Sequence, residues 1–211
     1  MLRTGLWWGM VVLTIPIALY AFAYVIVGEA MYPRELAASF SMRPWGINPH
    51  ALFGGIGLLT GAVQFHRGLR RRLRIHRLLG RLYVIACLFT GTAGLYMAAY
   101  SYGGWVTHAG FGMLGALLLF TTITGFRAIR RGDVETHWRW MLRSYALLFA
   151  AVMLRLELPL LASNFGFDTG YRIVSWLCWV PNVLVAETML RAWSRRMPAT
   201  VSLDAPEPAG T

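Results

Sequence analysis

Six apolar runs of about 16–24 residues follow one another along the chain, and no other feature constrains its fold as strongly. They cover roughly residues 6–27, 50–65, 78–100, 106–126, 138–161 and 171–192. A helix of about 20 residues crosses the roughly 30 Å of hydrocarbon in a bilayer. Because lipid cannot hydrogen-bond to the backbone, such segments must satisfy their own N–H and C=O groups, which favours helices. We therefore expect an all-α, polytopic membrane protein with six transmembrane helices, in which residues 1–197 form a single domain.

The charge distribution predicts how these helices are oriented. The 211-residue chain is 57% hydrophobic with a formal net charge of +11, and all 20 basic residues are arginines. Most arginines lie in short connections between apolar runs, seven of them within residues 66–81. This is the positive-inside pattern, with membrane lipid head groups as partners, and it argues against nucleic-acid binding. The sequence thus predicts a multi-pass protein of a bacterial inner membrane with both termini in the cytoplasm and a disordered tail at residues 198–211.

Four histidines lie at the ends of four successive apolar runs. By the predicted topology, His50 and His108 lie at the outer face, and His76 and His137 lie at the inner face. Ionisable residues in membrane helices usually have a function, and neutral imidazole is a good axial ligand of haem iron. The pattern predicts two b-type haems, with His50 and His108 holding the outer one and His76 and His137 the inner one. A fifth histidine, His66, fits neither pair, although it is a competitor of His76 as the inner ligand.

Glycines follow three of these histidines at helical spacing, on the face that carries the imidazole. They are Gly54 and Gly57 after His50, Gly112 and Gly115 after His108, and Gly80 after His76. One interpretation is close helix packing, for which membrane helices use small residues. The other is that a flat macrocycle beside its axial ligand needs a helix face without side chains. Because His137 has no glycine four residues later, the outer haem site is the better defined of the two.

The histidine spacing also indicates an internal repeat. Each outer histidine is followed 26 or 29 residues later by an inner one. The second and third spans therefore resemble one unit, and the fourth and fifth spans resemble its copy. Internal similarity of this kind predicts a pseudo-symmetric four-helix core, formed by a tandem two-helix repeat and flanked by the first and sixth spans.

Arg155 and Glu157 are charged residues inside the apolar fifth span. Arg155 follows His137 by 18 residues, which is five full helical turns, so both side chains are expected on one face. One interpretation is that Arg155 binds a propionate of the outer haem or an anionic substrate. The other is that its charge reaches the outer interface or pairs with Glu157 or Glu187.

Several functions remain open at this point. A zinc site at His50 and His108 lacks the further Cys, Asp or Glu ligands that such sites usually have. No nucleophile motif or phosphate-binding loop is present. The leading interpretation is a di-haem electron-transfer protein that receives electrons from a quinol or a soluble reductant. The alternatives are a single-haem protein that uses only the outer pair, and a cofactor-free small transporter or scaffold with interfacial histidines. The oligomeric state is open, a homodimer included.

Three stretches of the chain resemble a known family. They read N-P-H-A-L-F-G-G-I-G-L-L-T-G-A-V-Q-F, H-R-L-L-G-R-L-Y and H-W-R-W-M-L-R-S-Y-A. They are similar to an uncharacterised bacterial membrane family, domain of unknown function 2306, which implies no function. The order of the histidines also resembles the cytochrome b561 superfamily, in which core helices two to five each supply one haem ligand. That resemblance implies a transmembrane oxidoreductase with haem b as its cofactor.

Overall fold

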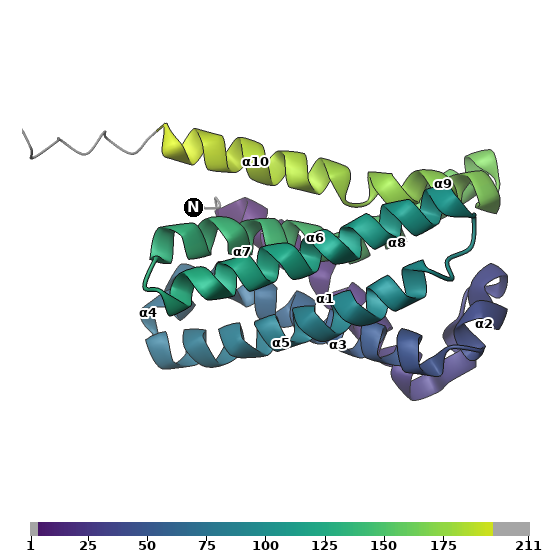
Figure 1. Ribbon diagram of the computed structural model, residues 1–211, viewed down its shortest axis with the longest axis horizontal. Helices are drawn as coiled ribbons and strands as arrows, with labels where there is room; N and C mark the ends of the chain where they lie inside the picture. Colours follow the sequence, from purple (N-terminus) through teal and green to yellow (C-terminus); the bar gives the residue numbers. More distant parts are fainter. Residues whose placement is uncertain (1–3, 196–211) are drawn as a thin grey trace, which may run out of the picture.

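The computed structural model describes residues 4–195, and this part of the chain is helical and contains no strands. The all-α class is therefore confirmed. The elements are α1 (Thr4–Val27), the 3-10 helix η1 (Gly28–Met31), α2 (Arg34–Ser41), α3 (Pro44–Gln64), α4 (Arg67–Arg71), α5 (Leu73–Ala98), α6 (Trp105–Arg130), α7 (Val134–Leu148), α8 (Ala150–Phe165), α9 (Phe167–Leu177) and α10 (Val180–Ser194) (Figure 1). The predicted tail, residues 198–211, lies outside the described residues.

Five segments of the described chain are long and apolar enough to cross a membrane. They are Trp7–Met31, Leu73–Ala98, Trp105–Arg130, Val134–Phe165 and Phe167–Ser194. The predicted second span, α3, is not one of them, because Asn48, Pro49 and His50 lower the hydropathy of its first turns. Helix α3 is nevertheless 21 residues long and packs between α1 and α5. The chain is thus a multi-pass membrane protein, and a sixth span at α3 stays a prediction.

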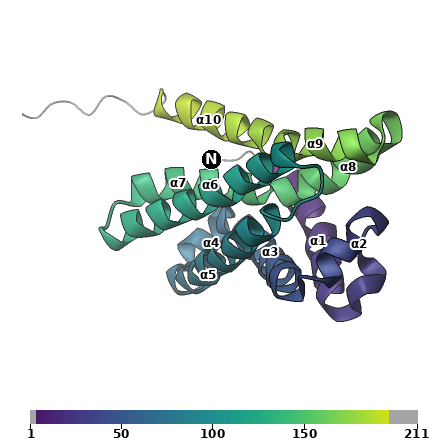
Figure 2. The same cartoon turned by 45° about the vertical axis from the view of Figure 1, so that its right-hand side comes forward.

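Four helices form a closed ring. Helix α3 packs along α5, α5 along α6, α6 along α7, and α7 returns to α3, so that α3 lies diagonally opposite α6, and α5 opposite α7. Helices α9 and α10 lie on the far side of this ring from α3 and α5 (Figure 2). We call the end of the bundle that carries α2 and the α5–α6 connection the outer end, on the right in Figure 1. The end that carries α4 and the α6–α7 connection is the inner end.

Two of the five segments are bent helices. Only Phe149 separates α7 from α8, and it keeps a helical conformation with φ −64° and ψ −13°. The break between α9 and α10 is explained by Pro181, which has no N–H to donate. In a continuous helix its ring would also clash with the carbonyl of Leu177, the residue at which α9 ends. The bend at Phe149 places α8 against α1 and α9. This arrangement carries residues of the predicted fifth span, Arg155 among them, toward α1.

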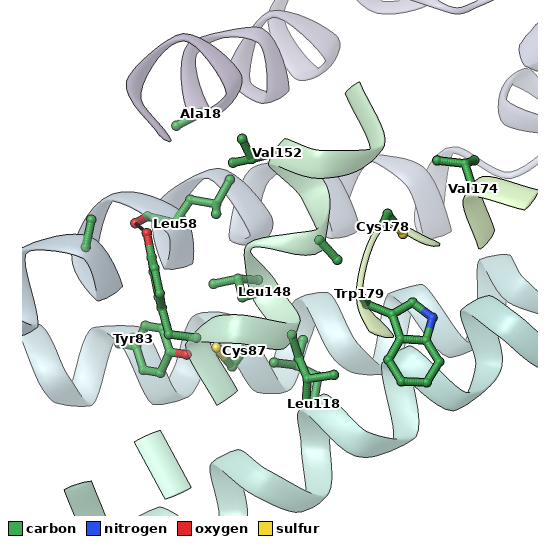
Figure 3. Packing of buried hydrophobic residues seen from close by; sticks show 14 of the residues in the cluster. Ala18, Leu58, Tyr83, Cys87, Leu118, Leu148, Val152, Val174, Cys178 and Trp179 are labelled. Carbon is green, nitrogen blue, oxygen red and sulfur yellow. Dashed lines mark hydrogen bonds between the residues drawn. The ribbon is translucent and has the colours of Figure 1, made fainter. Parts of the chain in front are cut away.

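The core of the ring is apolar but contains a buried chain of hydroxyl groups. Leu58, Cys87 and Leu148 are each at most 5% exposed and pack in its centre (Figure 3). Beside them, the Ser144 hydroxyl hydrogen-bonds both to the Tyr83 hydroxyl and to that of Thr122, each at 2.7 Å. Each of these three hydroxyl groups thus has a protein partner where water and headgroups are absent, as burial in hydrocarbon requires.

Candidate cofactor site

A cavity of about 750 Å³ occupies the outer half of the molecule. Helices α1, α3, α5, α6 and α8 form most of its wall, and α2 and the α5–α6 connection contribute at the outer end. Most of the lining is apolar, with few polar side chains. A volume of this size and a wall of this composition are typical of sites for small molecules and cofactors.

His50 lies on the cavity wall, and its ring is held in one orientation. Its Nδ1 atom is 3.0 Å from the carbonyl oxygen of Thr90 on α5, and the Thr90 hydroxyl donates to the His50 carbonyl at 2.8 Å. A carbonyl only accepts, so Nδ1 of neutral His50 carries the proton and Nε2 keeps its lone pair. Histidines that bind metals are commonly oriented by such a bond from the other ring nitrogen to a backbone carbonyl.

Glycines widen the cavity around this imidazole. A Cβ at Gly94 would lie 3.1 Å from Nδ1 of His50, so the ring occupies the space that a side chain would fill. Gly54 and Gly115, two of the predicted cofactor glycines, also line the cavity, together with Gly91. The glycine faces of α3, α5 and α6 thus meet at this cavity.

The other predicted glycines have different surroundings. A Cβ at Gly57 would lie 3.0 Å from the side chain of Leu148, so this glycine allows α3 to pack closely on α7. A Cβ at Gly112 would have no atom within 4 Å. Near the inner end, a Cβ at Gly80 would meet only the amide group of Gln64, at 3.9 Å. None of these three glycines lines the outer cavity.

The predicted partner of His50 is not on the cavity wall. His108, in the first turn of α6, is exposed, and its Nε2 is 2.9 Å from the carbonyl oxygen of Ser101 in the α5–α6 connection. It lies nearly on the same stripe of α6 as Gly115, two turns before it. The described residues thus place His50 at the cavity and His108 beside its outer rim.

The two inner histidines come from diagonally opposed helices of the ring, His76 from α5 and His137 from α7. The Nδ1 atom of His137 is 2.8 Å from the carbonyl oxygen of Gly125, so its Nε2 keeps the lone pair when the ring is neutral. The Nδ1 atom of His76 is buried and has no hydrogen-bond partner.

Arg155 faces the outer cavity from α8. Its Nη1 donates to the carbonyl of Ala151 at 3.0 Å, and its guanidinium lies 5.6 Å from the ring centre of Tyr20 on α1. Neither predicted ion pair of Arg155 is present. Glu187 is bound by Arg143 instead, at 2.5 and 2.9 Å, and Oε2 of Glu157 is buried without a hydrogen-bond partner.

Sequence reasoning missed two groups at this site. Thr90 and Gly91 lie about four turns after His76 on α5, close to the helix face that carries His76 and Gly94, so helical periodicity was a signal for them. The cavity residues Tyr20 and Tyr24 gave no such signal, because only the packing of α1 against α3 and α8 brings them to the cavity.

A zinc site finds no support in the part of the chain that the structure describes. No group of three or more His, Cys, Asp or Glu side chains is placed there to hold a metal ion. A haem differs in this respect, because two axial imidazoles are sufficient for its iron.

The chain was also compared with known proteins. Residues 47–190, more than half of the chain, match the model of the family described as predicted membrane protein (DUF2306). No curated protein and no solved structure matches it. The matched region runs from the start of α3 into α10 and contains all four paired histidines. The chain therefore belongs to the DUF2306 family of predicted membrane proteins.

Proposed function

We propose that this protein transfers electrons across the membrane through b-type haem bound in the α3–α5–α6–α7 ring. The observation that carries the proposal is the diagonal placement of the histidines. His50 and His108 come from one diagonal pair of helices at the outer end, and His76 and His137 come from the other pair at the inner end. In helix bundles, cofactors bind between side chains of facing helices, which reach them from opposite sides.

The inner residues suit a haem. The imidazole of His137 is oriented through Nδ1, and its Nε2 is left for the iron. The imidazole of His76 has a buried nitrogen without a hydrogen-bond partner. At Gly80, one turn after His76, the nearest group that a Cβ would meet is the side-chain amide of Gln64, at 3.9 Å.

The outer residues suit a haem in part. The cavity, its glycine walls and the oriented imidazole of His50 supply one side of the site. The second imidazole requires His108 to release the carbonyl of Ser101 and turn toward the stripe of Gly115. If His108 does not turn, His50 is the only imidazole at the outer site. The measured number of haems per chain then shows whether the outer site is occupied.

The function follows from the coordination. A haem with two axial imidazoles exchanges single electrons and has no open position for oxygen. Backbone carbonyls orient the rings of His50 and His137, which would hold the haems together with His108 and His76, and the mostly apolar wall would limit water in the outer cavity. The donor is a quinol or a soluble reductant, and the acceptor lies at the opposite face.

The test is a dithionite-reduced minus oxidised spectrum of protein purified in detergent after expression with ample haem. We expect sharp b-type bands and about two haems per chain. His50→Ala and His137→Ala should each remove about half of the haem. His66→Ala is the control and should remove none, because His66 is exposed and its ring centre lies 4.8 Å from that of Trp7 on α1. A folded, monodisperse protein without haem would overturn the proposal and favour a cofactor-free transporter.

A further inference from the structure

Arg155 is a partly buried cation that forms no ion pair within the described residues. Its Nε atom is buried and has no hydrogen-bond partner, and its Nη1 bonds only to the carbonyl of Ala151 one turn earlier. Burying a guanidinium is costly unless an anion or several hydrogen bonds compensate its charge, above all within a membrane. The structure therefore lacks a group that the chemistry of this residue requires.

No carboxylate of the described chain supplies that group. Glu157 lies two residues further along α8, about 200° around the helix from Arg155, and its Oε2 is itself buried without a partner. Glu187 is held by two hydrogen bonds from Arg143. The counter-ion of Arg155 must then come from outside residues 4–195.

The surroundings of Arg155 give the cavity a polar end. The Tyr20 ring lies beneath the guanidinium, and the Tyr20 hydroxyl donates weakly to the Tyr24 hydroxyl at 3.4 Å and to the carbonyl of Met31 at 3.5 Å. Arg155 and His50 both line this cavity. Most of the remaining wall is apolar. Such a site favours a ligand with an anionic group and a large apolar body.

We infer that Arg155 forms an anion subsite of the outer cavity, which binds the carboxylate of an amphiphilic ligand whose apolar body lies beside His50. A carboxylate can make two parallel hydrogen bonds to a guanidinium, which a neutral ester cannot match. The carboxylate has two possible sources. One is the propionate of a bound haem, which rests on the proposed function, and the other is a free long-chain fatty acid.

The experiment compares acid and ester forms of the same ligands. Full-length protein freed of haem in detergent is titrated with haemin and haemin dimethyl ester, and separately with palmitate and methyl palmitate. The variants are Arg155→Leu and Arg155→Lys. The matched control is Arg172→Leu, because Arg172 is an exposed arginine at the same end of the molecule that does not line the cavity. Arg155→Leu should fold, since it removes an uncompensated buried charge.

We expect the wild type to bind at least one of the two acids, haemin or palmitate, about tenfold or more tightly than the corresponding ester. Arg155→Leu should bind the acid and the ester equally, Arg155→Lys should keep part of the preference, and Arg172→Leu should keep all of it. A preference for haemin over its ester identifies the propionate as the source, whereas a preference for palmitate alone identifies a free acid.

The outcomes separate this inference from the proposed function. If no variant binds haem but Arg155 still determines the preference for palmitate, the haem proposal fails and the anion subsite stands. If the wild type and Arg155→Leu discriminate equally between acid and ester for both ligand pairs, the subsite is refuted, whatever the haem content.

Discussion

At the scale of single residues, the polar atoms that lack partners fall mostly at the two ends of the bundle. Among buried side-chain atoms of the described chain, those without a hydrogen bond include Gln64 Oε1, His76 Nδ1 and Arg155 Nε. Gln64 and His76 lie beside the inner site, and Arg155 lies at the outer cavity. Buried polar groups are nearly always satisfied, so each exception needs an explanation, and the proposed haem and carboxylate ligands would supply one at both sites.

The buried hydroxyl chain is the opposite case, because every member is satisfied. Ser144→Ala leaves the hydroxyls of Tyr83 and Thr122 without their shared partner, so we expect a loss of about 1–2 kcal/mol in the free energy of unfolding. Thermal unfolding in detergent measures the effect. The control is Ser163→Ala, because the exposed Ser163 hydroxyl has partners only within its own helix, donating to the carbonyl of Leu160 and accepting from the Asn164 side chain. Equal stability of the two variants would show that the network contributes nothing.

A second residue-scale prediction concerns the first turn of α7. The Asp133 side chain accepts a hydrogen bond from the backbone N–H of Thr136 at 2.9 Å, and hydrogen bonding at Thr136 holds the pKa of Asp133 below its ordinary value. A lowered pKa in the folded state means that ionised Asp133 stabilises the fold above the unfolded-state pKa of about 4. This stabilisation disappears as pH falls through the folded-state pKa.

Asp133→Ala should therefore lower the Tm at neutral pH and have no effect in strong acid. Asp133→Asn should retain most of the cap at neutral pH, because an amide oxygen also accepts from the helix N-terminus. Thermal unfolding across this pH range is the measurement. A Tm difference between Asp133→Ala and wild type that stays constant from neutral pH into acid would contradict the assignment.

At the scale of elements, glycine sets how closely the helices of the ring approach. A Cβ at Gly61 on α3 would overlap the rings of Tyr145 on α7 and Tyr83 on α5. These aromatic rings belong to the buried core and cannot move without disturbing their neighbours. Close approach, and not backbone flexibility, is thus the reason for glycine at this position.

Gly61→Ala should destabilise the protein by about 1–3 kcal/mol through overpacking. Gly9→Ala in α1 is the matched control, because a Cβ there meets nothing within 4 Å, and it should be neutral or slightly stabilising. Thermal unfolding of the two variants side by side gives the answer. A stable Gly61→Ala protein would mean that α3 can move away from α5 and α7 at little cost.

At the scale of the whole molecule, the described chain begins and ends at the inner end of the bundle (Figure 1). Exposed arginines concentrate at that end, between Arg71 and Arg81 and between Arg127 and Arg131. The positive-inside rule then predicts that the inner end faces the cytoplasm. Under the proposed function, this orientation determines which histidine pair would meet a cytoplasmic donor.

Single cysteines test this orientation. Cys87 and Cys178 are fully buried, so they should not react with a membrane-impermeant maleimide in the folded protein. On intact cells with a permeable outer membrane, Met42→Cys should be labelled, because Met42 is 69% exposed at the outer end. Arg131→Cys should be labelled only after the inner membrane is opened. The reverse pattern would place the His76–His137 pair on the outside.

The sequence by itself determined the all-α membrane class, the approximate positions of the helices and the end of the bundle at which each histidine lies. These properties depend on local hydropathy and charge, which every segment carries with it. The start of the second helix differs from the sequence prediction, because α3 begins at Pro44 and not at His50. Its first turns therefore include polar residues that lower its mean hydropathy.

Only the tertiary structure decided which side chains meet. The ring order made α3 and α6, and α5 and α7, diagonal partners. The bend at Phe149 places Arg155 near Tyr20. The Thr90 carbonyl orients His50 on the cavity wall, whereas the Ser101 carbonyl binds His108 outside it. Such contacts depend on helix rotation and on partners distant in sequence, and the periodicity of one helix contains no information about either.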